Sequence, residues 1–180
     1  VAIGGPDAAV DGVSRAGEVV VYRYDGSAWS EEATLSLTGP AMADSFGEAV
    51  ALRADTLVVG APGRAVAGDD DAGAIYVFTR SGRGWGAPTE ITASDRAPEM
   101  RFGAPLAFDG ETIVVGAPRA SPPDGFATGQ AYVLTRDGAG WAEQVLAPSF
   151  GVEGMDFVAA VAVDGDRIAI GAPRAGFEGT

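Results

Sequence analysis

The stretch Phe102–Trp141, FGAPLAFDGETIVVGAPRASPPDGFATGQAYVLTRDGAGW, is one copy of a unit that recurs along the 180-residue chain. Trp29, Trp85 and Trp141 mark the repeat, with steps of 56 residues. Further markers keep the same phase: Gly17, Gly73 and Gly129, and the Gly-Gly/Ala-Pro triplets that begin at Gly4, Gly60, Gly116 and Gly171. Several markers in one phase indicate a tandem array of structural repeats.

Composition excludes several classes of protein and of site. The net charge is −13, from 25 acidic residues and 12 basic residues that are all arginine. This balance disfavours nucleic acid and anionic membranes as partners, because both require a basic surface. Cysteine and histidine are absent, which excludes disulfides, thiol nucleophiles, serine–histidine triads and most zinc sites. The apolar runs are short, so we expect no insertion into a membrane.

The amino-acid composition and the N-terminus bear on the source organism and on secretion. Lysine and asparagine are both absent, and both have A-rich codons, which predicts a GC-rich bacterial gene. The chain begins at Val1 without a charged-then-apolar leader. A secretion signal, if the gene encodes one, is therefore expected outside this chain.

Each unit predicts four short antiparallel strands and essentially no helix. In the second copy the strands are expected at Ser45–Ala54, Thr56–Pro62, Ala74–Arg80 and Trp85–Ala93. Asp109-Gly110 and Asp164-Gly165, between apolar runs, are typical of tight hairpins because glycine accepts the positive φ of a primed turn. No sustained 3.6-residue apolar period occurs.

Four-stranded antiparallel units in tandem are typical of β-propeller blades, so the fold class is all-β. Small residues in each first strand, such as Ala49 and Ala104, suit the narrow end of a blade near the axis. Bulkier residues would fill the space between blades: Tyr76, Phe78, Trp85, Tyr132 and Leu134. A β-solenoid is the alternative, but its repeats are usually shorter.

The units run over residues 1–45, 46–101, 102–156 and 157–180, within one domain that spans 1–180. Both end units are cut, and about three blades are present, whereas closed propellers have roughly four to eight. The chain is therefore expected to be part of a longer array. Further blades from the same gene, or a second chain, would be needed for closure.

Two copies of a paired motif resemble the FG-GAP repeat: Phe46-Gly47 with Gly60-Ala61-Pro62, and Phe102-Gly103 with Gly116-Ala117-Pro118. This repeat forms the seven-bladed propeller of integrin α-subunit heads and of many secreted bacterial proteins, and the present copies look most like the bacterial branch. The last copy departs from it, with Phe157-Val158. The resemblance implies an extracellular or cell-surface protein that serves adhesion, scaffolding or protein binding.

The resemblance would also imply an aspartate-rich calcium loop between the first two strands. Here that connection is only Arg53-Ala54-Asp55 or its counterparts, too short to wrap six or more oxygen ligands around an ion. We therefore expect no cofactor in these copies and leave calcium open only for copies outside this chain. Asp69-Asp70-Asp71, the one acidic run, is a weak metal candidate beside the simpler interpretation of a solvated loop.

The connections between strands two and three, and between strands four and one, are the longer ones and should share one face of the propeller. A rigid scaffold with variable loops on one side is typical of binding proteins. Loops that vary only because nothing constrains them are the competing interpretation. The candidate binding residues are Asp7, Asp11, Arg64, Asp69, Asp70, Asp71, Arg119, Asp124 and Phe126.

The predicted function is non-enzymatic binding of a protein or glycan ligand whose identity the residues do not specify. The alternative is a glycan-active propeller enzyme that uses paired carboxylates, such as Asp44 with Glu48 or Asp164 with Asp166. The recurring tryptophans could stack on carbohydrate, but their strict position after a glycine-rich turn favours packing at the blade rim.

Overall fold

The computed structural model describes residues 1–82, 84–121, 128–138, 140–147 and 157–174. Strands, turns and loops make up these residues, with no helix among them, and so none that could span a membrane. The strands are β1 (Ala2–Gly5), β2 (Glu18–Tyr24), β3 (Trp29–Leu35), β4 (Ala49–Arg53), β5 (Thr56–Ala61), β6 (Ala74–Ser81), β7 (Gly84–Trp85), β8 (Thr89–Ile91), β9 (Leu106–Phe108), β10 (Thr112–Ala117), β11 (Gln130–Asp137), β12 (Gly140–Leu146), β13 (Ala160–Asp164) and β14 (Arg167–Gly171).

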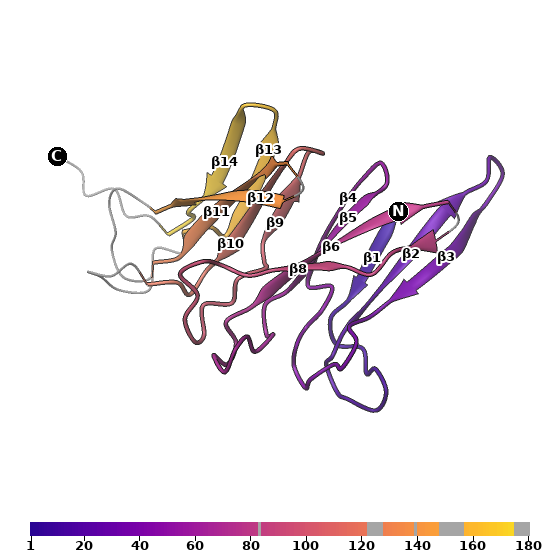
Figure 1. Ribbon diagram of the computed structural model, residues 1–180, viewed down its shortest axis with the longest axis horizontal. Coiled ribbons are helices and arrows are strands. Elements are labelled where there is room, and N and C mark those ends of the chain that lie inside the picture. The colour runs from indigo at the N-terminus through magenta and orange to yellow at the C-terminus, as the bar shows by residue number, and fades with distance from the viewer. Residues whose placement is uncertain (83, 122–127, 139, 148–156, 175–180) are drawn as a thin grey trace.

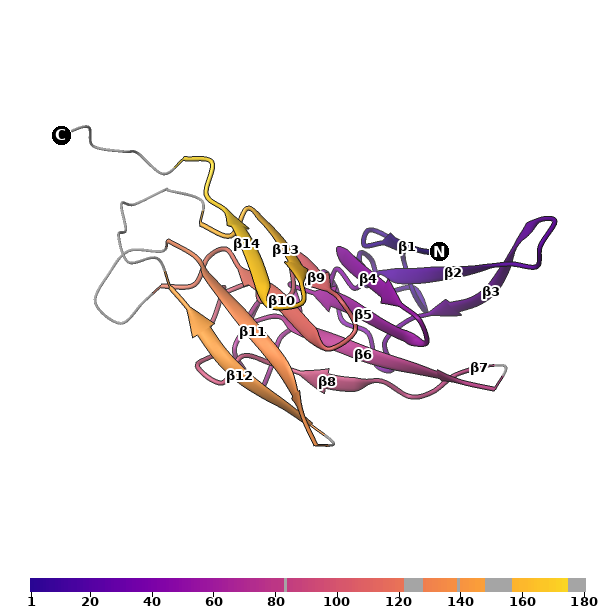
Figure 2. The same cartoon turned by 90° about the horizontal axis from the view of Figure 1, so that it is seen from above.

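The strands form four antiparallel sheets that follow one another along the longest axis of the molecule (Figure 1). The first contains β1–β3, the second β4–β8, the third β9–β12 and the fourth β13–β14. Tight hairpin tips lie at one edge and the long connections at the other (Figure 1), and the view from above shows the same succession (Figure 2). The predicted all-β propeller architecture is confirmed as a partial propeller that does not close into a ring.

Two predicted strands differ from the structure. The segment Ser45–Ala54 forms a strand only over β4, because Phe46-Gly47 lie in a turn and Gly47 has a φ of 91°. The fourth strand of the second sheet is divided into β7 and β8 by residues 86–88. Pro88 lies in that gap and has no N–H with which to continue the ladder.

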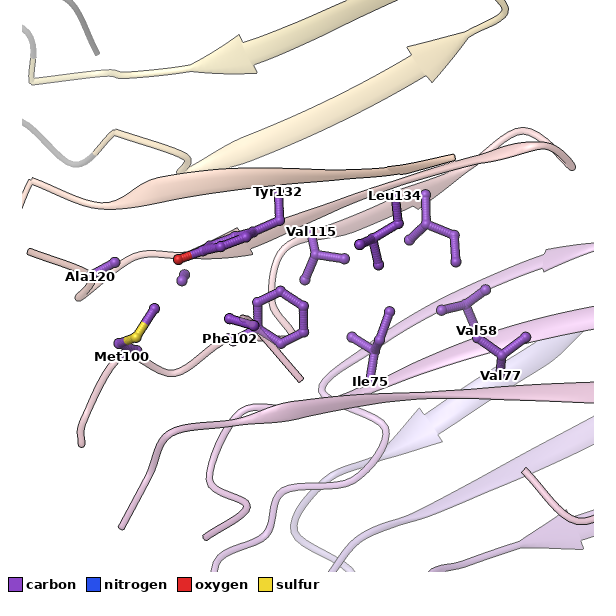
Figure 3. Close-up of a cluster of buried hydrophobic side chains, with 12 residues drawn as sticks. Val58, Ile75, Val77, Met100, Phe102, Val115, Ala120, Tyr132 and Leu134 are labelled. Carbon is purple, nitrogen blue, oxygen red and sulfur yellow. The ribbon is translucent and has the colours of Figure 1, made fainter. Parts of the chain in front are cut away.

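The hydrophobic core lies between the sheets. One cluster joins the first sheet to the second through Val19, Val21, Phe46, Leu57, Val59, Tyr76 and Phe78. Its counterpart joins the second to the third through Val58, Ile75, Phe102, Ile113, Val115, Tyr132 and Leu134, and Figure 3 shows Phe102 between the two sheets. The predicted packing of large side chains between blades is confirmed.

The three tryptophans differ in burial, because only two of them have a preceding sheet to pack against in the described part of the chain. Trp85 and Trp141 are partly buried and pack against the first and second of these clusters, as predicted. Trp29 is 56% exposed. Its counterparts pack against the preceding sheet, and the described residues place no sheet in front of the first one.

Main-chain hydrogen bonds tie each sheet to the next. The amide of Phe46 donates to Ala16 O at 3.0 Å, and the amide of Phe102 donates to Ala72 O at 3.0 Å. Two earlier bonds in each ladder have matching positions: Ala43 to Ser14 and Ser45 to Arg15, then Glu99 to Asp70 and Arg101 to Asp71. The repeated motif therefore builds the junction from backbone atoms.

Glycine is required where these backbones meet. A Cβ on Gly60 would overlap the carbonyl oxygen of Gly103 in the next sheet, and a Cβ on Gly73 would overlap the backbone of Phe102. Gly73 also has a φ of 86°, which side chains rarely adopt. The glycines of the sequence motif thus mark the closest inter-sheet approaches.

The two junctions use different side chains at one matching position. In the first, Asp44 is 1% exposed and its Oδ2 accepts from Arg64 Nη1 at 2.9 Å and from the Ala41 amide at 2.7 Å. In the second, the sulfur of Met100 accepts a hydrogen bond from the Ala97 amide at 2.8 Å. Ala120 occupies the position that matches Arg64 one repeat earlier. A buried ion pair and an apolar pair therefore support the same backbone.

Replacing Gly60 with alanine tests the backbone approach. We expect Gly60→Ala to lower the free energy of unfolding by about 2–3 kcal/mol through overpacking. Gly84→Ala is the control, because a Cβ at Gly84 meets nothing within 4 Å, and it should change stability by less than about 0.5 kcal/mol. Urea denaturation measures both. Equal effects of the two variants would contradict this account of the motif.

Exchanging Asp44 and Arg64 for their second-junction counterparts tests the ion pair. Asp44→Met or Arg64→Ala alone should cost about 3–5 kcal/mol, because one leaves the half-buried Arg64 and the other the fully buried Asp44 without its partner. The double variant should lie within about 1 kcal/mol of the original chain, since removing a whole buried pair is often neutral. A double-mutant cycle by chemical denaturation gives the coupling. A double variant as unstable as the sum of the single variants would refute it.

Candidate binding face

The long connections lie at one edge of the sheets, which we call the loop face (Figure 1). Its described parts include residues 7–16, 38–45, 63–72 and 94–101, together with 119–121 at the start of the next connection. The opposite edge, the hairpin face, carries short turns such as Ala54-Asp55 between β4 and β5. The predicted separation of long and short connections on two faces is confirmed for these loops.

The loop-face connections have a defined backbone. Val10 pairs with Val13, and Val66 pairs with Asp69, each around a two-residue turn. The first turn residues, Asp11 and Ala67, have φ angles of 52° and 53°. Two loops with different sequences therefore adopt one shape. This recurrence, together with the inter-sheet ladders, argues against loops that vary for lack of constraint.

The four longer ranges of the loop face are acidic, and their arginines are paired with carboxylates. The four ranges contain eight acidic residues and four arginines. Each arginine lies against an acid: Arg15–Asp7 at 3.2 Å, Arg64–Asp44 at 2.9 Å, Arg96–Asp69 at 3.6 Å and Arg101–Asp71 at 3.9 Å. The exposed pairs contribute little to stability. They do neutralise part of the acidic surface and leave the other carboxylates to face solvent.

The acidic run has a packing role that the sequence did not indicate. Asp69 and Asp71 point to arginines of the following connection, while the carbonyl of Asp70 accepts from the Glu99 amide at 2.8 Å. In the described part of the chain, no three acidic, histidine or cysteine side chains converge to hold a metal ion.

The other candidate residues have different surroundings. Arg64 was predicted to be a surface binding residue. It is instead partly buried against Asp44 and belongs to the junction between the sheets. Asp7 pairs with Arg15, whereas Asp11 is exposed with no ion pair among the described residues. Arg119 is exposed just after β10. Asp124 and Phe126 lie outside the described residues.

Two exposed residues on this face were not identified from the sequence. A main-chain hydrogen bond from the Glu99 amide to the Asp70 carbonyl holds Glu99 beside Asp70. Met42, in the connection before β4, is 75% exposed. Both belong to connections between strands four and one, which the repeat phase located. Only the inter-sheet ladder shows that such residues adjoin the loops between strands two and three.

The two carboxylate pairs considered for catalysis have different surroundings. Asp44 and Glu48, one predicted pair, contact different arginines, Arg64 and Arg101. Asp164 and Asp166 lie exposed on the hairpin face.

Among the described residues, the carboxyl groups whose pKa is shifted all move downward. Amide donors of Ala28 and Ser27, with the Ser27 hydroxyl, lower the pKa of Asp25 to about 2. Amides of Thr112 and Glu111 lower the pKa of Asp109, and a hydrogen bond from Arg80 lowers the pKa of Glu32. A general acid requires the opposite shift.

Comparison with known proteins agrees with this geometry. The profile of the FG-GAP repeat matches residues 29–78 and 85–134, together more than half of the chain. Each span runs from the last hairpin of one sheet into the third strand of the next and so includes a complete junction. A search of curated proteins found no match. The integrin-like or bacterial character of the repeats stays a prediction, but the chain belongs to the FG-GAP repeat family.

Proposed function

We propose that this chain is a non-enzymatic binding module that engages a partner protein through its loop face, outside the cell or at the cell surface. The observation that carries the proposal is a firmly held loop backbone with exposed carboxylates at Asp11, Asp70 and Glu99. FG-GAP repeats typically occur in extracellular and cell-surface proteins and mediate protein interaction or adhesion, which supports the same assignment.

The partner should offer a basic surface. Asp11, Asp70 and Glu99 have no arginine against them in the described residues, whereas Arg15, Arg64, Arg96 and Arg101 are already paired. A net charge of −13 would steer a positively charged partner toward the protein and repel acidic ones. Met42 adds an exposed flexible apolar side chain, a type that suits adaptable contacts.

A glycan-active enzyme is less well supported. Hydrolysis by paired carboxylates needs one acid with a raised pKa, about 5–10 Å from the other. The shifted carboxyl groups of the described residues have lowered pKa values, and the buried Asp44 is neutralised by Arg64. We expect no release of reducing ends when the chain is incubated with a panel of polysaccharides. Turnover that increases with protein concentration would overturn the non-enzymatic assignment.

Removing the unpaired acids tests the binding face. The triple variant Asp11→Ser, Asp70→Ser, Glu99→Gln should capture its partner from the source's extracellular proteins at least tenfold less efficiently than the original chain, and the original binding should weaken with salt. Glu111→Gln, Asp164→Ser, Asp166→Ser is the matched control, because it removes three exposed acids from the hairpin face. Quantitative mass spectrometry compares the captured proteins. Loss of capture in the control alone would reject the loop face.

A further inference from the structure

A small pocket with charged and apolar walls lies at the hairpin-face end of the junction between the first and second sheets. Its volume is about 160 Å³. Four charged side chains line it: Arg23 and Glu32 from the first sheet, Arg80 from the second, and Asp55 from the β4–β5 turn. Trp85 of β7 and Tyr22 of β2 form part of the apolar wall of the pocket. The pocket lies on the face opposite the proposed partner-binding loops.

A β-bulge directs one of these residues into the junction. Val21 pairs with Ala33 and Tyr22 pairs with Glu31, which leaves Glu32 as the extra residue of β3. The matching strands of the third sheet, β11 and β12, pair without an interruption. Bulges bend the strand locally, and they are frequent beside functional sites, where they re-aim a side chain.

Glu32 and Arg80 form a close pair that leaves further bonding capacity. Nε and Nη2 of Arg80 both donate to Oε1 of Glu32, at 2.9 and 2.6 Å, so both bonds converge on one carboxylate oxygen. Nη1 of Arg80 lies 3.8 Å from Asp55 Oδ1, too far for a hydrogen bond. The pocket thus contains both ionised donors and ionised acceptors with places for a ligand.

Trp85 supplies a second, independent observation. Its indole Nε1 is buried and has no hydrogen-bond partner. It lies near Glu32 and contributes, after Arg80 and Arg23, to the lowered pKa of that carboxyl, but it has no hydrogen bond of good geometry with the described residues. A buried N–H without a well-formed bond is costly, and a ligand oxygen toward which the Trp85 ring turns would satisfy it.

The next junction lacks this combination. One repeat further along, Arg136 and Trp141 correspond to Arg80 and Trp85, but Pro88 stands in place of Glu32. There the guanidinium lies over the indole, 4.5 Å from the ring centroid. The bulged carboxylate is therefore specific to the first junction, and the second junction offers a natural comparison.

The pocket chemistry selects one class of ligand. Two arginines and two carboxylates balance in charge, which disfavours both simple anions and simple cations. A hydroxyl group can donate to a carboxylate and accept from a guanidinium or an indole N–H at the same time. The volume is below the roughly 300–1,000 Å³ of pockets for drug-sized ligands. A single ring with several hydroxyl groups meets these conditions.

We propose that the pocket formed by Glu32, Asp55, Arg80 and Trp85 is a binding subsite for one sugar ring of a glycan. Its hydroxyl groups would accept hydrogen bonds from Trp85 Nε1–H and Arg80 and donate to the carboxylates of Glu32 and Asp55. An aromatic wall beside polar side chains gives a partly apolar sugar both a packing surface and oriented bonds.

Nuclear magnetic resonance of the 15N-labelled chain tests this subsite with methyl glycosides of glucose, galactose, mannose, rhamnose and fucose as probes. At least one glycoside should shift the Trp85 indole signal saturably and leave the Trp141 indole signal in place. Trp85→Phe keeps an aromatic ring but removes the N–H, and it should weaken binding about tenfold, as expected for one lost hydrogen bond. Glu32→Gln should weaken it as well.

Trp141→Phe is the matched control and should bind the same glycoside with unchanged affinity. Thermal unfolding of each variant establishes that the fold is intact, and Trp85→Phe is chosen because it keeps most of the packing. The proposal is overturned if no glycoside shifts the Trp85 signal, or if folded Trp85→Phe and Glu32→Gln both bind as well as the original chain. A stronger response of the same signal to sulfate or to an arginine-containing peptide would also overturn it, in favour of another ligand class.

Discussion

The contact between backbones at each junction sets the geometry of the whole molecule. The turn that carries Phe46 or Phe102 donates hydrogen bonds to the loop of the preceding sheet, and glycines such as Gly73 leave room for that approach. The phenylalanine ring then fills the space between the two sheets. Because main-chain atoms make the contact, its form does not depend on neighbouring side chains.

That independence explains how the junctions can differ. Asp44 with Arg64, and Met100 with Ala120, occupy the same position on the same ladder. The first pair offsets part of the cost of burying charge with hydrogen bonds, although Asp44 Oδ1 and Arg64 Nε have no partner among the described residues, and the second avoids the charge altogether. The same freedom lets Glu32 enter one junction on a bulge while Pro88 occupies the matching position of the next. Sites can therefore change in one repeat without altering the array.

The two faces have different capacities for binding. The loop face presents unpaired carboxylates on a firmly held backbone, which suits an extended contact with a basic protein surface. The junction pocket of the hairpin face is small, balanced in charge and partly aromatic, which suits a single polar ring. The spacing of the repeat was enough to predict the loop face, because the position of a connection within the repeat decides at which end of the strands it lies. It could not locate the pocket, because its residues come from four separate segments and depend on a one-residue irregularity in strand pairing.

The sequence by itself determined the repeat, the strand order, the hairpin turns and the large side chains between sheets, because these follow from spacing, turn chemistry and alternation. Only the tertiary structure decided that Phe46-Gly47 precedes the strand, that Arg64 and Asp71 serve packing, and that Glu32 points at Arg80. These outcomes depend on which atoms of the neighbouring sheet lie within reach. The proximity of Asp70 to Glu99 has the same origin, since the inter-sheet ladder joins residues that no local pattern connects.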